Sequence, residues 1–137
     1  MNEFSILPIL QKIPLFANLD ESESEELIKN IQLQYYPVDY RLFEQGELGE
    51  KMFIIKSGKV LIFTEGKEIA TLENNAFFGE MALMGSQPRN AGAKTLEESE
   101  IFTLEKKDFD SLLADNPEAA EKIKQAFAER YSKSKLS

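Results

Sequence analysis

The chain contains no cysteine and no histidine. Without cysteine it can form neither a disulfide nor a thiolate metal site, which fits a reducing compartment, so we expect a cytoplasmic protein. Without histidine it lacks imidazole metal ligands, the Ser-His-Asp triad and the usual acid–base catalyst. These absences predict a protein that is not an enzyme, with no catalytic residues, no bound metal and no cofactor.

Long apolar runs are also missing. No segment is long enough to cross a bilayer, and the N-terminus lacks the pattern of a signal peptide. The net charge of −8 opposes nucleic-acid binding, because that affinity depends on basic patches that displace counterions. We therefore expect neither a membrane nor a nucleic acid as a partner. A small anion is not excluded, since it needs only one local positive site.

What the chain does contain is enough apolar surface for one core. It has 137 residues, 42% of them hydrophobic, including ten phenylalanines. This length and composition predict a single domain over residues 1–137. Apolar residues recur at helical spacing in 4–16, and Asp20 followed by Glu23 forms the polar start of a second helix.

The middle of the chain has the pattern of a β-rich structure. Short apolar runs separated by glycine turns occupy 41–43, 52–55, 60–63, 69–72, 91–95 and 101–104. Such spacing is typical of an antiparallel barrel or jelly roll. We expect an α+β fold in which a jelly-roll-like β-roll, about 35–105, follows N-terminal helices and precedes two C-terminal helices, about 108–131. Asn116-Pro117 should divide these last two helices.

The segment 78–93 carries the features of an anion site. Gly79, Glu80 and Ala82 open a predicted helical turn, 80–84, whose small residues let a ligand approach the backbone N–H groups. Arg89 follows, and its guanidinium offers a planar fork of donors that matches a phosphate. Because Glu80 would repel a phosphate, a sugar hydroxyl is the natural group for its carboxylate to accept from.

This segment resembles the signature of cyclic nucleotide-binding domains, as found in cAMP-dependent kinase regulatory subunits, nucleotide-gated channels and catabolite-activator regulators. The matching residues are Phe78-Gly79-Glu80-Met81-Ala82-Leu83 and Pro88-Arg89-Asn90-Ala91. Gly46, Gly49 and Gly58 resemble the family's turn glycines. The likeness covers about residues 10–131.

The resemblance implies a role for each matched position. Arg89 would pair with the cyclic phosphate, helped by N–H groups near Ala82 and by Asn90. Glu80 would accept from the ribose 2′-hydroxyl, and Gly79 would open the backbone to the sugar. The full set of ligand-binding residues would be Phe78, Gly79, Glu80, Met81, Ala82, Arg89, Asn90 and Ala91, with Ile62 and Ile69 as walls of the base pocket. The candidate lid residues over the base are Phe127, Arg130 and Tyr131. For Phe127 and Tyr131, packing within the helix is an equally good interpretation.

The chain departs from the family pattern at three places. Asn75 replaces a glycine before the signature and also tolerates a left-handed backbone. Gly92 and Ala93 replace a common Thr-Val pair, which should thin one strand and loosen the pocket wall. Asn90 stands where a threonine or serine helps to read the ligand, so we expect cAMP to be favoured over cGMP.

The resemblance implies a stand-alone regulatory module in which ligand binding repositions the C-terminal helix and signals to an unidentified protein partner. One alternative is a degenerate domain of the same fold that binds no nucleotide and serves as an adaptor or dimerisation domain. A second is a cyclic phosphodiesterase. That enzyme would need a carboxylate metal site or base, and the resemblance commits Glu80 to the sugar.

Overall fold

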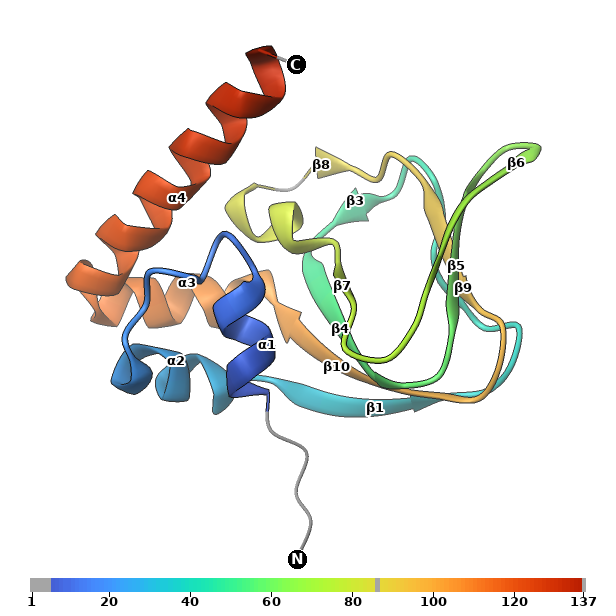
Figure 1. The fold of residues 1–137 in the computed structure, drawn as a ribbon, viewed down its shortest axis with the longest axis horizontal. Coiled ribbons are helices and arrows are strands. Elements are labelled where there is room, and N and C mark those ends of the chain that lie inside the picture. Colours follow the sequence, from blue (N-terminus) through green and yellow to red (C-terminus); the bar gives the residue numbers. More distant parts are fainter. Residues whose placement is uncertain (1–5, 86, 137) are drawn as a thin grey trace, which may run out of the picture. The chain divides into compact units, whose positions relative to one another are not determined.

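A computed structural model describes residues 6–85 and 87–136, with side chains over 6–85 and 88–129 (Figure 1). These residues divide into two compact units, a helical unit (up to Asn30 and from Lys107) and a β unit (Ile31–Lys106). The single domain expected for 1–137 stays a prediction. No helix in the described part is both long enough and apolar enough to cross a membrane.

The β unit contains two four-stranded sheets and one small sheet, all antiparallel. The first sheet has the order β1 (Gln32–Tyr36), β10 (Ser99–Glu105), β4 (Lys51–Ser57), β7 (Phe77–Phe78). The second has the order β2 (Arg41–Phe43), β9 (Gly92–Thr95), β5 (Val60–Thr64), β6 (Lys67–Leu72). The third pairs β3 (Leu48–Gly49) with β8 (Gln87–Pro88).

Both large sheets contribute to one core. The buried cluster consists of Phe53, Ile55, Val60, Phe78, Ala93 and Ile101. Because successive strand residues point to opposite faces, these side chains mark the inner faces of the two sheets. The α+β class and the β-roll are confirmed, as an open roll of paired sheets rather than a closed barrel. The roll begins at Gln32, slightly before the expected position.

The strand around Gly92 differs from the prediction that a glycine there would thin it. Gly92 pairs with Phe63 across the β5–β9 ladder. A β-carbon at Gly92 would lie 2.7 Å from Cζ of that phenylalanine, so the ring already occupies the space. The guanidinium of Arg41 lies 5.1 Å from the centre of the same ring. The prediction of a thinned strand is therefore wrong at Gly92, because a neighbouring aromatic side chain fills the gap.

The helical unit consists of α1 (Leu7–Lys12), α2 (Glu21–Ile28), α3 (Lys106–Asp115) and α4 (Pro117–Leu136). The predicted start of α2 is confirmed as a capping box. Glu23 N donates to Oδ1 of Asp20 (2.8 Å), and Asp20 N donates to Oε1 of Glu23 (2.9 Å). Lys122 Nζ donates to the same Oε1 at 2.7 Å and so joins α4 to α2.

The helix boundaries agree with the expected ones in part. The first helix, α1, ends at Lys12, just before Pro14, where the helical spacing was expected to stop, and it begins at Leu7 rather than at residue 4; residues 4 and 5 lie outside the described part. The last helix continues to Leu136 rather than ending near residue 131. The predicted break between α3 and α4 is confirmed, because α4 begins at Pro117 and Asn116 Oδ1 accepts from Ala119 N (3.2 Å).

Candidate functional site

The predicted turn of helix is present as η1 (Glu80–Met84), a 3₁₀ helix that follows β7. Gly79 before it has φ 77°, a left-handed conformation that glycine adopts without strain. Asn75 has φ 74°, so the left-handed backbone that we expected at this asparagine is confirmed. Ala82 N donates to Gly79 O at 3.2 Å, which closes the first turn of η1.

The backbone of Arg89 is fixed by the neighbouring turn. Arg89 N donates to Glu47 O (2.6 Å), and Gly46 N donates to Arg89 O (2.8 Å). Together with the β3–β8 pair, these bonds hold Arg89 against the 46–49 segment. The position of the arginine thus depends on a segment about forty residues earlier in the chain rather than on its own neighbours.

Two glycines make room for the Arg89 side chain. A β-carbon at Gly49 would lie 2.7 Å from Cζ and Nε of Arg89 and 3.1 Å from Cβ of Ala82. A β-carbon at Gly79 would lie 2.7 Å from Nη1 of Arg89. No side chain fits at such distances, so both positions require glycine while the arginine stays in place. We call this arrangement of Gly49, Gly79, Ala82 and Arg89 the arginine cradle.

The guanidinium also contacts an aromatic ring and a carbonyl. Its Cζ lies 4.1 Å from the centre of the Phe43 ring and 5.8 Å from that of Phe53, within the range of cation–π attraction. Nη2 donates to Lys51 O at 2.9 Å. The aromatic cluster continues to Phe78, whose ring is stacked on Phe53 at 4.9 Å and 11°.

One donor of this guanidinium has no partner. Nε of Arg89 is buried and makes no hydrogen bond within the described residues. Burial lowers the pKa of Arg89, and the nearby Glu47 carboxylate partly offsets that effect. An unsatisfied buried donor is costly and often marks a functional position. An arginine stays protonated at neutral pH, so the cradle presents a positive charge with one free N–H.

A cavity adjoins this charge. Its volume is about 190 Å³, and it is lined by Leu42, Phe43, Glu47, Leu48, Glu50, Lys51, Phe53 and Arg89. Of the predicted site residues, only Arg89 belongs to this lining.

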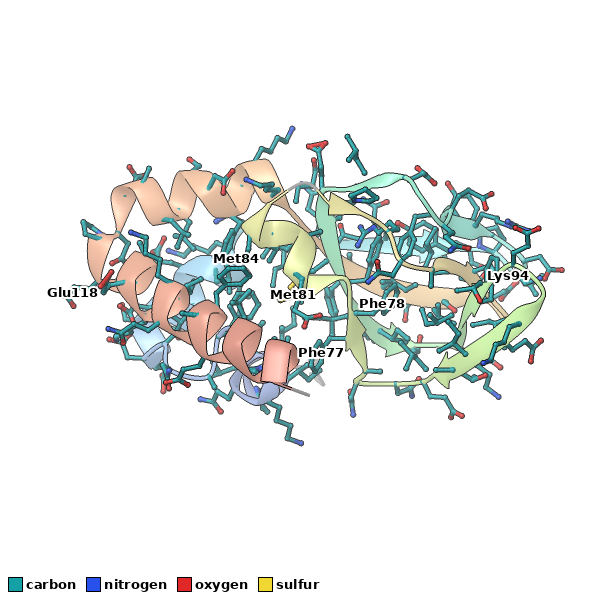
Figure 2. All side chains as sticks on the ribbon, turned by 90° about the horizontal axis from the view of Figure 1, so that it is seen from above. Phe77, Phe78, Met81, Met84, Lys94 and Glu118 are labelled. Atoms are coloured by element: carbon teal, nitrogen blue, oxygen red, sulfur yellow. The ribbon has the colours of Figure 1, made fainter. Side chains whose placement is uncertain are left out.

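The other predicted site residues lie in different environments. Phe78 is in the core cluster on β7, while Phe77 before it lies on the opposite face of the strand (Figure 2). Glu80 is buried, with 7% exposure, and Met81 in η1 is half-buried. Asn90 is exposed and Ala91 is half-buried.

The residues expected to form the base wall and the lid differ in their burial. Ile62 packs against the core cluster, whereas Ile69 is 53% exposed. Ile69 lies where the register between β5 and β6 shifts, on an edge strand in which all residues from Lys67 to Thr71 are exposed. Phe127 is half-buried on α4, and the side chains of Arg130 and Tyr131 lie outside the described residues.

Sequence reasoning missed the groups that hold the arginine, namely Phe43, Glu47, Lys51 O and Phe53. Gly49 was identified only as a turn glycine. The glycine at this position was the one sequence signal of a close contact, because glycine lets another group approach the backbone. The aromatic contacts had no local signal, because they come from β2 and β4.

Comparisons with known proteins agree on the fold. The family model of the cyclic nucleotide-binding domain matches residues 33–116. A cGMP-dependent protein kinase of Caenorhabditis briggsae is 32% identical over 117 residues, covering 80% of this chain and 16% of the kinase. A cyclic AMP receptor protein of Thermus thermophilus is 30% identical over 128 residues, covering 90% of this chain and 59% of the receptor.

A solved structure supports the same conclusion. The N-terminal domain of a transcriptional regulator from Streptomyces coelicolor A3(2) superposes with a TM-score of 0.82 at 29% identity. The match covers 92% of this chain and 94% of that domain. The chain thus spans only part of its full-length relatives but nearly all of a solved domain.

Proposed function

The chain belongs to the cyclic nucleotide-binding domain family, and we propose that it uses Arg89 to bind the phosphate of a cyclic nucleotide. The observation that carries the proposal is the buried Nε of Arg89, which lacks a partner among the described residues. A phosphate oxygen would satisfy this donor. A charge-assisted bond to an anion is stronger than one to a neutral acceptor.

The residues around Arg89 support an anion rather than a cation. The guanidinium is held between Gly49 and Gly79. Within the described residues, its side chain donates to a neutral carbonyl, Lys51 O. No carboxylate neutralises it through a salt bridge in the described part, since Glu47 acts at longer range. The positive charge is therefore available to a ligand.

We propose that Glu80 accepts from the ribose 2′-hydroxyl. Its burial at the start of η1, directly after Gly79, places it beside the cradle in sequence. Asn90 is a second candidate for the phosphate, since its exposed side chain is free to reorient. Ile62 is the better supported wall for the base, because Ile69 is largely exposed.

We propose that cAMP is favoured over cGMP. The support is Asn90, which stands where a guanine-favouring threonine would be expected. The relatives do not decide the question, because one is named for cGMP and another for cyclic AMP. Titration with both nucleotides decides it, and a tighter cGMP complex would reverse the preference.

We further propose that binding repositions α4 and so passes a signal to a protein partner, with Phe127, Arg130 and Tyr131 as candidate lid residues. NMR amide spectra of the chain with and without cAMP test this step. Shifts confined to the β unit would contradict it, whereas changes in α4 beyond Phe127 would support it.

Isothermal titration of the wild type and Arg89→Ala with cAMP tests the site. Loss of a charge-assisted hydrogen-bonding partner should weaken binding by about 2 kcal/mol or more, which is on the order of thirtyfold. Equal affinities would remove Arg89 from the site. Circular dichroism should show an intact fold, because the cradle is at the edge of the core.

Arg41→Ala is the matched control. Arg41 also lies over a phenylalanine ring, Phe63, but its charge is paired with the exposed Glu44 at 2.6 Å. Its removal should leave cAMP affinity unchanged. Recovery of intact cAMP after the titration supports a binding module, and hydrolysis would instead indicate an enzyme. Absence of heat with either nucleotide would favour the non-binding adaptor.

A further inference from the structure

The two large sheets of the β unit end in four edge strands, and three of them are protected against further pairing. β7 has only two residues, and β2 has three with a register shift between Arg41 and Phe43. β6 carries Lys67 and Glu68, and its pairing with β5 is irregular. Short length, charge and bulges are the devices by which proteins keep sheet edges from pairing.

β1 has none of these devices. It pairs with β10 in unbroken register from Gln32 opposite Thr103 to Tyr36 opposite Ser99. Its sequence, Gln-Leu-Gln-Tyr-Tyr, contains no charge, proline or glycine, and four of its five residues are exposed. In Figure 1, β1 runs along the outside of β10. Among the described residues, no strand pairs with its other side.

The side chains of β1 add an apolar row to this open edge. Leu33 is 45% exposed and Tyr35 is 60% exposed, and they share one face because they are two residues apart. An edge of unpaired N–H and C=O groups accepts an extended segment, and alternate side chains select which segment fits. The occupant should therefore be an uncharged strand with apolar residues at alternate positions.

β1 itself meets that description. We propose that β1 of one chain pairs antiparallel with β1 of a second copy, joining their first sheets edge to edge. The net charge of −8 makes two copies repel each other, so an uncharged strand is the favourable place for contact. The proposal does not depend on nucleotide binding.

One register uses the whole strand. A two-fold axis at Gln34 places Gln34 opposite itself, Gln32 opposite Tyr36, and Leu33 opposite Tyr35 of the second copy. Residues that oppose each other then share a face, as an antiparallel pair requires. The arrangement forms two identical leucine–tyrosine cross-strand pairs, a stabilising combination of aromatic and aliphatic groups.

Glu100, the acidic residue that pairs with β1 from β10, does not oppose its own copy in this register. Glu100 is the β10 partner of Tyr35, and Phe102 is the partner of Leu33. Across the joined sheet, Glu100 of one copy is followed by its own Tyr35, then by Leu33 and Phe102 of the second copy. Glu100 is also close to Lys56, at 3.9 Å, which reduces its repulsion. The Glu100 carboxylates of the two copies thus permit the pairing.

Sedimentation velocity of the full chain without nucleotide tests the proposal. The wild type should show a concentration-dependent dimer. Gln34→Lys places two like charges opposite each other at the axis and should raise the dimer Kd by about tenfold or more. Thr71→Lys makes the same charge change on exposed β6 and should leave dimerisation unchanged. A wild type that stays monomeric up to about 1 mM overturns the proposal, as does a Gln34→Lys protein that dimerises normally.

A second variant and a second measurement separate the interface from misfolding. Circular dichroism checks the fold of Gln34→Lys; if it is lost, Leu33→Glu at another exposed β1 position should abolish the dimer instead. Amide exchange over residues 32–36 should slow as wild-type concentration rises. Exchange that is independent of concentration in a dimerising protein would place the interface elsewhere. cAMP titration of Gln34→Lys should give wild-type affinity, which distinguishes this proposal from the nucleotide site.

Discussion

The helical unit and the β unit each bury a charged side chain, and the two side chains differ in how fully they are hydrogen-bonded. In the helical unit the side chain of Glu23 is 7% exposed, and its Oε1 accepts from both Asp20 N and Lys122 Nζ. In the β unit Arg89 is half-buried against a phenylalanine ring and donates to one carbonyl, while its buried Nε has no described partner.

The difference separates a structural charge from one available to a ligand. A buried carboxylate with two donors has its desolvation offset and stabilises the contact between helices. A buried guanidinium with an unsatisfied N–H leaves part of its desolvation cost uncompensated, and an added anion would recover it. Substitutions at Glu23 should therefore change stability, and substitutions around Arg89 should change affinity.

Gly79→Ala should have the largest effect, because it disturbs the position of Arg89 in the β unit. The new β-carbon would lie 2.7 Å from Nη1 of Arg89, and the left-handed φ of 77° is strained for alanine. We expect a loss of about 1–2 kcal/mol in the free energy of unfolding. We also expect cAMP to bind at least about tenfold more weakly, as urea unfolding and calorimetry would show.

Gly66→Ala is the control for that strain. Gly66 has a similar φ of 72°, but a β-carbon there would meet nothing within 4 Å. It should lose stability through the backbone alone and keep wild-type affinity. If Gly79→Ala also bound cAMP normally, the close contact with the arginine would have no role in binding.

Glu23→Ala should affect the helical unit instead. It removes the acceptor of Asp20 N, which is one half of the capping box of α2, together with the acceptor for Lys122, while the Asp20 side chain still caps the helix. The free energy of unfolding should fall by about 1 kcal/mol, a typical net contribution of a hydrogen bond. Glu26→Ala, which breaks only the exposed pair with Lys29, should cost no more than about 0.5 kcal/mol. If urea unfolding showed equal losses of free energy for Glu23→Ala and Glu26→Ala, the buried acceptor would contribute no more than the exposed pair.

Phe43→Leu should give a smaller effect on the β unit. It removes the ring under the Arg89 guanidinium, 4.1 Å away, and keeps an apolar side chain. We expect cAMP affinity to fall by about threefold, because an exposed cation–π contact contributes about 0.5–1 kcal/mol. Phe43→Tyr retains the ring and should bind like the wild type. The Nε–H resonance of Arg89 should shift in the leucine variant only; an unchanged resonance would argue against ring contact in solution.

The smallest expected effect is a pH dependence in the helical unit. The hydrogen bond with Glu23 raises the pKa of Lys122 above its ordinary value of 10.5. Because the folded pKa is the higher one, the pair's stabilisation is fully present below the unfolded pKa. It is lost as the pH rises through the folded pKa. The melting temperatures of the wild type and Lys122→Met should therefore differ at about pH 8 and converge at about pH 12. A constant difference would contradict the ion pair.

Features with local signals could be predicted from the sequence. The capping box at Asp20 and Glu23, the turn at Glu80–Met84 and the break at Asn116 each depend on residues a few positions apart. The left-handed backbone at Asn75 also follows from the residue type. In these cases the physical cause lies within the segment itself.

Contacts between distant segments could not be predicted. The ring and carbonyl that hold Arg89 belong to Phe43 and Lys51, and no periodic pattern links those strands to the arginine. The two-residue strands β3 and β8 are too short to produce a pattern. Ile69 appeared suited to a pocket wall, but it lies on the exposed edge strand β6.

The ring of Phe63 over Gly92 has an evolutionary consequence. Because that ring occupies the space of a side chain at position 92, the two positions form a coupled pair. Homologous sequences with a larger residue at 92 should have a smaller, non-aromatic residue at 63, so the pair should covary. A mutational library that varies only one of these positions would find few tolerated changes, whereas a library that varies both would reach the Thr-Val pattern by compensating substitutions.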